Sequence, residues 1–135
     1  MISKIRLDEL EYQITGACIE VHRALGPGLL ESVYHQCLAF ELDLRGVSFS
    51  QECIVNVHYK GKDLDTRLRA DFVIENGLVV ELKAVEQFDP IHFAQLLTQM
   101  KLLGLPKGLL INFNCLNIVK EGKKPFVNEF YRTLK

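Results

Sequence analysis

The sequence RADFVIENGLVVELKA, residues 69–84, constrains the fold more than any other stretch of the chain. Two largely apolar runs flank the turn sequence ENG, which is typical of two antiparallel strands joined by a tight loop. Three charged residues, Asp71, Glu81 and Lys83, interrupt the apolar runs. A charge that is buried without a partner costs free energy, so the register of the hairpin decides whether these residues are tolerated.

Two loop lengths are compatible with this turn. A two-residue Asn-Gly turn would put Asp71 opposite Leu82 and would scatter the charges over both faces. A three-residue loop, with Gly77 left-handed in a glycine bulge, would put Ile74 opposite Leu78 and Asp71 opposite Glu81. We predict the second register, because a shift of one residue exchanges the faces and only this register makes one face wholly apolar. The apolar face would hold Ala70, Phe72, Ile74, Leu78, Val80 and Leu82.

The other face of the hairpin would bring two acids together. Opposite residues have Cβ atoms about 5 Å apart, so Asp71 and Glu81 would repel each other unless a proton or a cation lay between them. Mg²⁺ binds a few carboxylate oxygens together with water. Lys83, on the same face, would stabilise a developing negative charge or help to deprotonate a metal-bound water. The spacing equally fits a surface of salt bridges, in which Asp71 pairs with Arg69 and Glu81 with Lys83.

Helical spacing and strand alternation extend the prediction to the whole chain. The expected helices are 7–25, 31–45 and 90–103, and the expected strands are 53–59, 66–74, 78–83 and 108–113. The long crossover before the last strand makes that strand parallel to its predecessor. We therefore expect one α/β domain over residues 1–135, with a mixed sheet flanked by helices. The tail, 117–135, is expected to add an edge strand or two and a short end segment.

Composition excludes several classes of protein. The balance of 48% hydrophobic and 24% charged residues is that of an ordinary folded domain, and no apolar run approaches the roughly 20 residues of a membrane span. Acids near the N-terminus argue against export, and four widely spaced cysteines suggest free thiols in the cytoplasm. The net charge of −1 gives no overall signal for nucleic acid, although residues 81–135 carry eight basic against five acidic side chains.

Four stretches in order carry a resemblance to a known family: GLLESVY, which fits the motif GxxExxY, then RADFVIENGLVVELKA, FAQLLTQMKLLG and GLLINF. Together they resemble the GxxExxY protein family, a branch of the PD-(D/E)XK nuclease superfamily, over about residues 10–128. The resemblance implies a restriction-endonuclease-like core of helix, three antiparallel strands, helix and parallel strand, here with an extra N-terminal helix. Ala70-Asp71 stands where the superfamily's name has Pro-Asp.

The resemblance also implies a site. Glu31, Asp71 and Glu81 would be metal ligands for Mg²⁺, with Mn²⁺ as the alternative ion. Lys83 would be the catalytic lysine, and Gln95 would be the polar catalytic residue on the following helix. From the residues alone, the solvent side of that helix is the favoured place for Gln95.

Two further residues are candidates for binding substrate. Arg69 suits a phosphate contact, although a salt bridge to Asp71 or Glu81 is as plausible. Tyr34 shares a helix face with Glu31. The expected function is metal-dependent hydrolysis of nucleic acid, DNA rather than RNA. The alternative is a non-catalytic binding or assembly module that retains the fold, for example as a homodimer.

Overall fold

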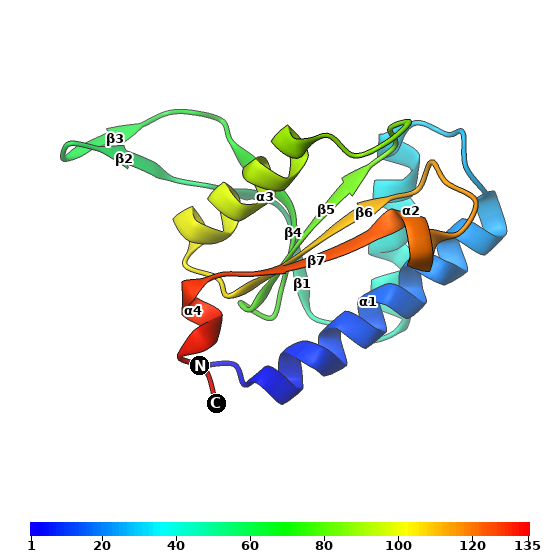
Figure 1. Ribbon diagram of the computed structural model, residues 1–135, viewed down its shortest axis with the longest axis horizontal. Helices are drawn as coiled ribbons and strands as arrows, with labels where there is room; N and C mark the ends of the chain where they lie inside the picture. The colour runs from blue at the N-terminus through cyan, green and yellow to red at the C-terminus, as the bar shows by residue number, and fades with distance from the viewer.

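The computed structural model covers residues 1–135 and contains a five-stranded mixed sheet between two helical layers (Figure 1). The strand order is β1-β4-β5-β6-β7. The strands are β1 (Phe49–Ile54), β4 (Arg69–Ile74), β5 (Leu78–Lys83), β6 (Lys107–Asn112) and β7 (Lys123–Val127). The helices are α1 (Lys4–Leu25), α2 (Glu31–Leu44), α3 (Pro90–Leu103) and α4 (Glu129–Arg132), with one turn of π-helix, η1 (Ile118–Gly122).

Strand directions follow the expected restriction-endonuclease-like arrangement. β1, β4 and β5 pair antiparallel, β6 is parallel to β5 after the crossover through α3, and β7 is an antiparallel edge strand on β6. The predicted mixed α/β fold, including the extra N-terminal helix, is therefore confirmed. The tail supplies one edge strand and the short helix α4, as expected, while the turn η1 was not foreseen.

Two apolar layers attach the helices to the sheet. On one face, α1 and α2 pack on residues such as Phe72, Val80 and Leu82. On the other face, α3 packs on Val79 and Leu110. The sheet is therefore covered on both sides, which explains why β6 is apolar throughout and entirely buried.

Local signals explain where the helices begin and end. The Ser3 side chain accepts a hydrogen bond from the Arg6 backbone N–H at the start of α1. Proline occupies the first turn of α3, and Gly104 ends that helix in the left-handed conformation. Helix α2 has no side-chain cap, and Glu31 lies in its first turn, where a negative charge suits the helix dipole. No helix is both long enough and apolar enough to cross a bilayer.

The predicted strand 53–59 is wrong as a single strand. β1 begins earlier, at Phe49, and the chain leaves the sheet at Val55, whose buried side chain joins the core under α3. The remaining residues form β2 (Val57–Tyr59), which pairs with β3 (Lys62–Leu64) in a separate hairpin that projects from the molecule (Figure 1). Two consecutive strands share one alternating pattern, and the pattern does not reveal the break.

The register of the β4–β5 hairpin is confirmed. Phe72 pairs with Val80 and Ile74 with Leu78, across a three-residue loop. The left-handed residues of the loop are Glu75 and Asn76, however, and not Gly77. Glycine at 77 leaves room for a neighbouring side chain instead, because a Cβ there would lie 2.6 Å from Ile2 Cδ1, which would have to move. The expected apolar face is also confirmed except for Ala70, which belongs to the core under α3.

Candidate functional site

Asp71 and Glu81 lie where the β4–β5 ladder ends. The last regular pair is Phe72 with Val80. Beyond it, the Asp71 backbone N–H donates to Glu81 Oε1 (2.8 Å), and the Leu82 backbone N–H donates to Asp71 Oδ2 (2.9 Å). Each carboxylate is thus fixed by the backbone of the opposite strand. Each also keeps a second oxygen that makes no hydrogen bond within the protein, and that oxygen is free to bind a ligand.

Buried negative charge accumulates around this pair. Burial, and then the charge of Asp71, raise the pKa of Glu81 to about 8. Burial also raises the pKa of Asp71, although the Leu82 N–H stabilises its anion. Partial burial and the charge of Asp71 raise the pKa of Glu31 at the start of α2. The three acids therefore act on one another, and a cation would relieve their repulsion.

No lysine or arginine forms an ion pair with Glu31, Asp71 or Glu81. Lys83 makes no ion pair with Glu81, although its charge acts to lower the pKa of both Glu81 and Glu31. The Arg69 guanidinium donates to the backbone oxygen of Glu52 (3.3 Å) and reaches neither Asp71 nor Glu81. The alternative of a polar face closed by internal salt bridges is therefore not what the structure shows.

On the α3 side of β5, Glu81 and Lys83 line a cavity of about 370 Å³. Gln95 lies on the same cavity wall, so the helix residue predicted from the resemblance does face the ExK strand. Gln99, one turn further along α3, also lines the cavity and is 7% exposed, and its Oε1 has no hydrogen-bond partner. From the residues alone, Gln99 belongs with Gln95 to a polar stripe for which the solvent side of the helix is the favoured interpretation.

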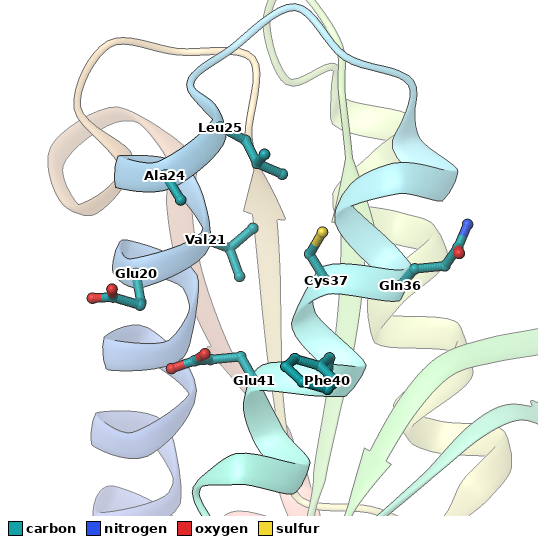
Figure 2. Close-up of a pocket in the computed structure, with 8 residues that line it drawn as sticks. All are labelled: Glu20, Val21, Ala24, Leu25, Gln36, Cys37, Phe40 and Glu41. Carbon is teal, nitrogen blue, oxygen red and sulfur yellow. The ribbon is translucent and has the colours of Figure 1, made fainter.

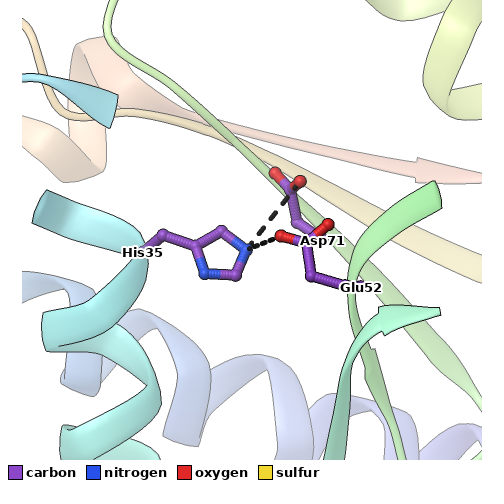
Figure 3. Close-up of side chains that lie close together, drawn as sticks. All are labelled: His35, Glu52 and Asp71. Carbon is purple, nitrogen blue, oxygen red and sulfur yellow. Dashed lines mark ion pairs between the residues drawn. The ribbon is translucent and has the colours of Figure 1, made fainter. Parts of the chain in front are cut away.

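On the α2 side, Glu31 and Asp71 line a second cavity, of about 320 Å³, together with His35 and Glu52. Figure 3 shows His35 from α2 pointing toward the carboxylates of Glu52 and Asp71. Sequence reasoning identified neither His35 nor Glu52 as a site residue. The available signal was the spacing of Glu31 and His35, four residues apart on one helix face.

Tyr34 holds the loop that precedes the site. Its ring is fully buried and stacks on Phe113, with centroids 4.5 Å apart. Its hydroxyl donates to the Gly26 backbone oxygen (2.6 Å) and accepts from the Leu29 N–H (3.1 Å). Tyr34 thereby fixes the start of α2 and, with it, Glu31. The predicted contact with substrate would require this side chain to leave its pocket.

Asn112 holds the segment that follows Lys83. Its Oδ1 accepts from the Val85 backbone N–H (3.0 Å), and its Nδ2 donates to the Val85 oxygen (2.9 Å). The Phe113 N–H donates to the Lys83 oxygen (3.0 Å). The end of β5 is therefore tied to β6, which limits how far Lys83 can move. Nothing in the sequence distinguished this asparagine from other strand-end residues.

The donor set of the acids fits a divalent cation. Glu31, Asp71 and Glu81 offer carboxylate oxygens, which Mg²⁺ and Mn²⁺ both accept. Asp71 and Glu81 are adjacent, but Glu31 lines the cavity on the α2 side and Glu81 the cavity on the α3 side, so the three predicted ligands do not all line one cavity. An apolar cavity of about 370 Å³ between α1 and α2 offers no comparable chemistry (Figure 2). Five of its eight lining residues are hydrophobic, and it shares no residue with the acid cluster, so we place the chemistry at the hairpin.

Comparison with known proteins agrees with this geometry. A family model described as the PD-(D/E)XK nuclease superfamily matches residues 8–125, which include α2, the hairpin, α3 and β6. No curated protein and no solved structure matches the chain. Nucleases of this superfamily generally use divalent metal ions, and the narrower GxxExxY assignment stays a prediction. By the extent of this match, the chain belongs to the PD-(D/E)XK nuclease superfamily.

Proposed function

We propose that this protein is a divalent-cation-dependent nuclease that hydrolyses phosphodiester bonds in nucleic acid. One observation carries the proposal: the crossed hydrogen bonds fix Asp71 and Glu81 at the opening of the β4–β5 ladder, where no lysine or arginine forms an ion pair with either acid. Buried acids with raised pKa values in a cleft are typical of functional sites, because such an arrangement costs stability. The family match supplies the reaction class.

Each residue has a distinct role in this mechanism. Glu31, Asp71 and Glu81 would hold Mg²⁺ or Mn²⁺, which polarises the scissile phosphate and promotes ionisation of water. The Lys83 ammonium would stabilise the charge that develops on the phosphate oxygens, and it would orient the attacking water. Gln95, on the cavity wall beside Glu81, has an amide that can hydrogen-bond the same water or a phosphate oxygen.

A projecting arm supplies basic surface for the substrate. The arm comprises residues 55–68 and contains β2 and β3 (Figure 1). Its basic residues, Lys60, Lys62 and Arg67, are exposed and outnumber its two acids, Asp63 and Asp65. β4 begins directly after the arm, and Asp71 is its third residue, so the arm arises beside the acid cluster. Contacts between these basic residues and phosphate groups would compensate for the net charge of −1 on the chain, which by itself does not attract nucleic acid. We favour DNA over RNA as the substrate.

The test is a cleavage assay on labelled single-stranded, duplex and branched DNA and on RNA, with Mg²⁺ or Mn²⁺. We expect cation-dependent products from the wild type and none from Asp71→Asn or Lys83→Ala. Asp43→Asn and Lys124→Ala, at exposed positions away from the site, are matched controls that should cleave normally.

Cleavage that survives in Asp71→Asn would refute the mechanism. Absence of products from the wild type on every substrate, with the cation still bound, would favour the non-catalytic binding module.

A further inference from the structure

Three potential metal ligands from three elements meet next to the nuclease site. His35 on α2, Glu52 on β1 and Asp71 on β4 each offer a ligand atom, and these atoms lie within 4.8 Å of one another (Figure 3). His35 Nε2 is 3.2 Å from Glu52 Oε1 and 3.9 Å from Asp71 Oδ1. Asp71 Oδ1 is the oxygen that the Leu82 N–H leaves free. The cavity that these residues line is about 320 Å³, which leaves room for an ion and water.

The imidazole of His35 is held in place but not satisfied. Its ring stacks on Phe72 with the centroids 4.5 Å apart, which limits its rotation. Its Nε2 is buried and makes no hydrogen bond, although the carboxylates of Glu52 and Asp71 lie within ion-pair distance of it. Buried polar atoms normally make hydrogen bonds, so an imidazole nitrogen that faces two carboxylates without one fits a site for a cation between the three side chains.

The backbone of Glu52 supports the same conclusion. Gln51 pairs with Phe72 and Cys53 with Ala70, so Glu52 lies directly opposite Asp71 in the sheet. Like charges in this position destabilise a strand pair. Glu52 also has φ of 50°, which is unusual for a residue other than glycine within a strand. Strain of this kind and the repulsion would both be compensated by a cation between the two side chains.

We propose that His35, Glu52 and Asp71 form a subsite for a divalent transition-metal ion. The subsite is separate from the Glu81 carboxylate and depends on the proposed nuclease function only because Asp71 is shared. An imidazole nitrogen disfavours Mg²⁺, which prefers oxygen ligands, and favours ions of the Mn²⁺ to Zn²⁺ series. The subsite would therefore give the protein a preference for transition metals that the three acids alone do not provide.

Gln51 would set the tautomer of the histidine. Its amide nitrogen, Nε2, lies 3.4 Å from His35 Nδ1 and can donate to it. When a metal binds His35 Nε2, the amide would turn over and present its oxygen to Nδ1, so that Nδ1 carries the proton and Nε2 keeps its lone pair for the metal. Metal-bound histidines commonly donate their second N–H to an oxygen in this way. Gln51 is thus a positioning residue, and Gln51→Ala should weaken metal binding less than His35→Gln does.

The test uses Co²⁺ as the probe, because its visible absorption changes with the ligands and the coordination geometry of the ion and needs no activity. Full-length protein would be titrated with Co²⁺ by absorption and calorimetry, in the presence of excess Mg²⁺. We expect His35→Gln and Glu52→Gln to lower the affinity for Co²⁺ about tenfold or more. The exposed His58, on the arm, provides the matched control His58→Gln, which should bind Co²⁺ as the wild type does.

A fourth variant separates this inference from the proposed function. Glu81→Gln should lose cleavage but retain the Co²⁺ absorption, since Glu81 is not a ligand of the subsite. If the wild type fails to cleave and His35→Gln still loses Co²⁺, the nuclease proposal fails and the subsite stands. Co²⁺ affinity and absorption that are the same in wild type, His35→Gln and Glu52→Gln would overturn the subsite, whatever the cleavage assay shows.

Discussion

Replacing Glu81 by glutamine should stabilise the protein at alkaline pH when divalent cations are absent. Glu81 is 8% exposed, and burial and the charge of Asp71 raise its pKa from an ordinary 4.5 to about 8. The glutamine keeps the Oε1 atom that accepts from the Asp71 N–H, so the crossed hydrogen bond can remain. It removes only the requirement to bury a negative charge.

The sign and size follow from proton linkage. Below about pH 4.5 the folded and unfolded states both hold the proton on Glu81. Between about pH 4.5 and 8 the unfolded state loses it while the folded state retains it, so the free energy of unfolding falls by up to about 1.4 kcal/mol per pH unit. Asp71 shares this environment, so only part of the effect belongs to Glu81 alone. We expect the free energy of unfolding of Glu81→Gln to exceed that of the wild type by about 2 to 4 kcal/mol at about pH 8, and to equal it near pH 5.

Urea unfolding with a chelator, followed by circular dichroism from about pH 5 to 9, measures this difference. Glu86→Gln, at an exposed position in the following loop, is the matched control and should follow the wild type. Added Mg²⁺ should stabilise the wild type at alkaline pH far more than Glu81→Gln, since the cation replaces the proton. Parallel pH profiles of wild type and Glu81→Gln would refute the reasoning about the buried charge.

Other parts of the molecule give further expectations. Glu11→Gln should lower the free energy of unfolding, measured in urea near neutral pH, by about 2 kcal/mol. The reason is that Glu11 pairs with Lys107 (2.6 Å) and Lys123 (2.8 Å). These hydrogen bonds lower the pKa of Glu11, so the advantage of the wild type should vanish as the pH falls below about 4.5. Asn112→Ala should lower the free energy of unfolding by about 2 kcal/mol, because both hydrogen bonds to the Val85 backbone are lost. Hydrogen exchange of the backbone amides that follow β5 should become faster, and unchanged exchange would show that Asn112 does not hold this segment. Replacing the three basic residues of the arm by glutamine should reduce the salt dependence of DNA binding by a slope of about 2 to 3, and an unchanged slope would exclude the arm from the interface.

Most of the fold could be predicted from the sequence because each main helix and strand is specified by the residues within it. Helical periodicity, the capping sequence Asp89-Pro90 and the alternation in β4 and β5 each identify an element without reference to the rest. The error at residues 53–59 has a different origin. The alternation continues through Val55 and Val57, but β1 ends at Ile54 and the chain enters the arm at Val55. Only tertiary contacts, such as the burial of Val55 under α3, mark the end of the strand.

The candidate site likewise contains some residues that could be predicted from local sequence and others that could not. Asp71 and Glu81 could be paired from the sequence because a hairpin register depends only on the loop between its strands. Glu52 could not, because its position opposite Asp71 depends on how β1 docks on β4, across an intervening arm. Because the expected strand began at residue 53, Glu52 was never considered as a neighbour of the acids. Gln99 was overlooked because helical spacing alone does not tell which polar side of α3 faces the sheet.

The contrast between two clusters of charge in this protein indicates where function has overridden stability. Lys107 is almost fully buried, yet Glu11 lies against it, and Glu11 also pairs with Lys123. Opposite charges are matched there, as they must be when a buried charge serves only the fold. At Asp71 and Glu81 the acids lie against each other, and no basic side chain forms an ion pair with Glu81 although Lys83 lines the same cavity. A chain that can pair buried charges in one place but keeps them unpaired in another is consistent with selection for a cation at the second place.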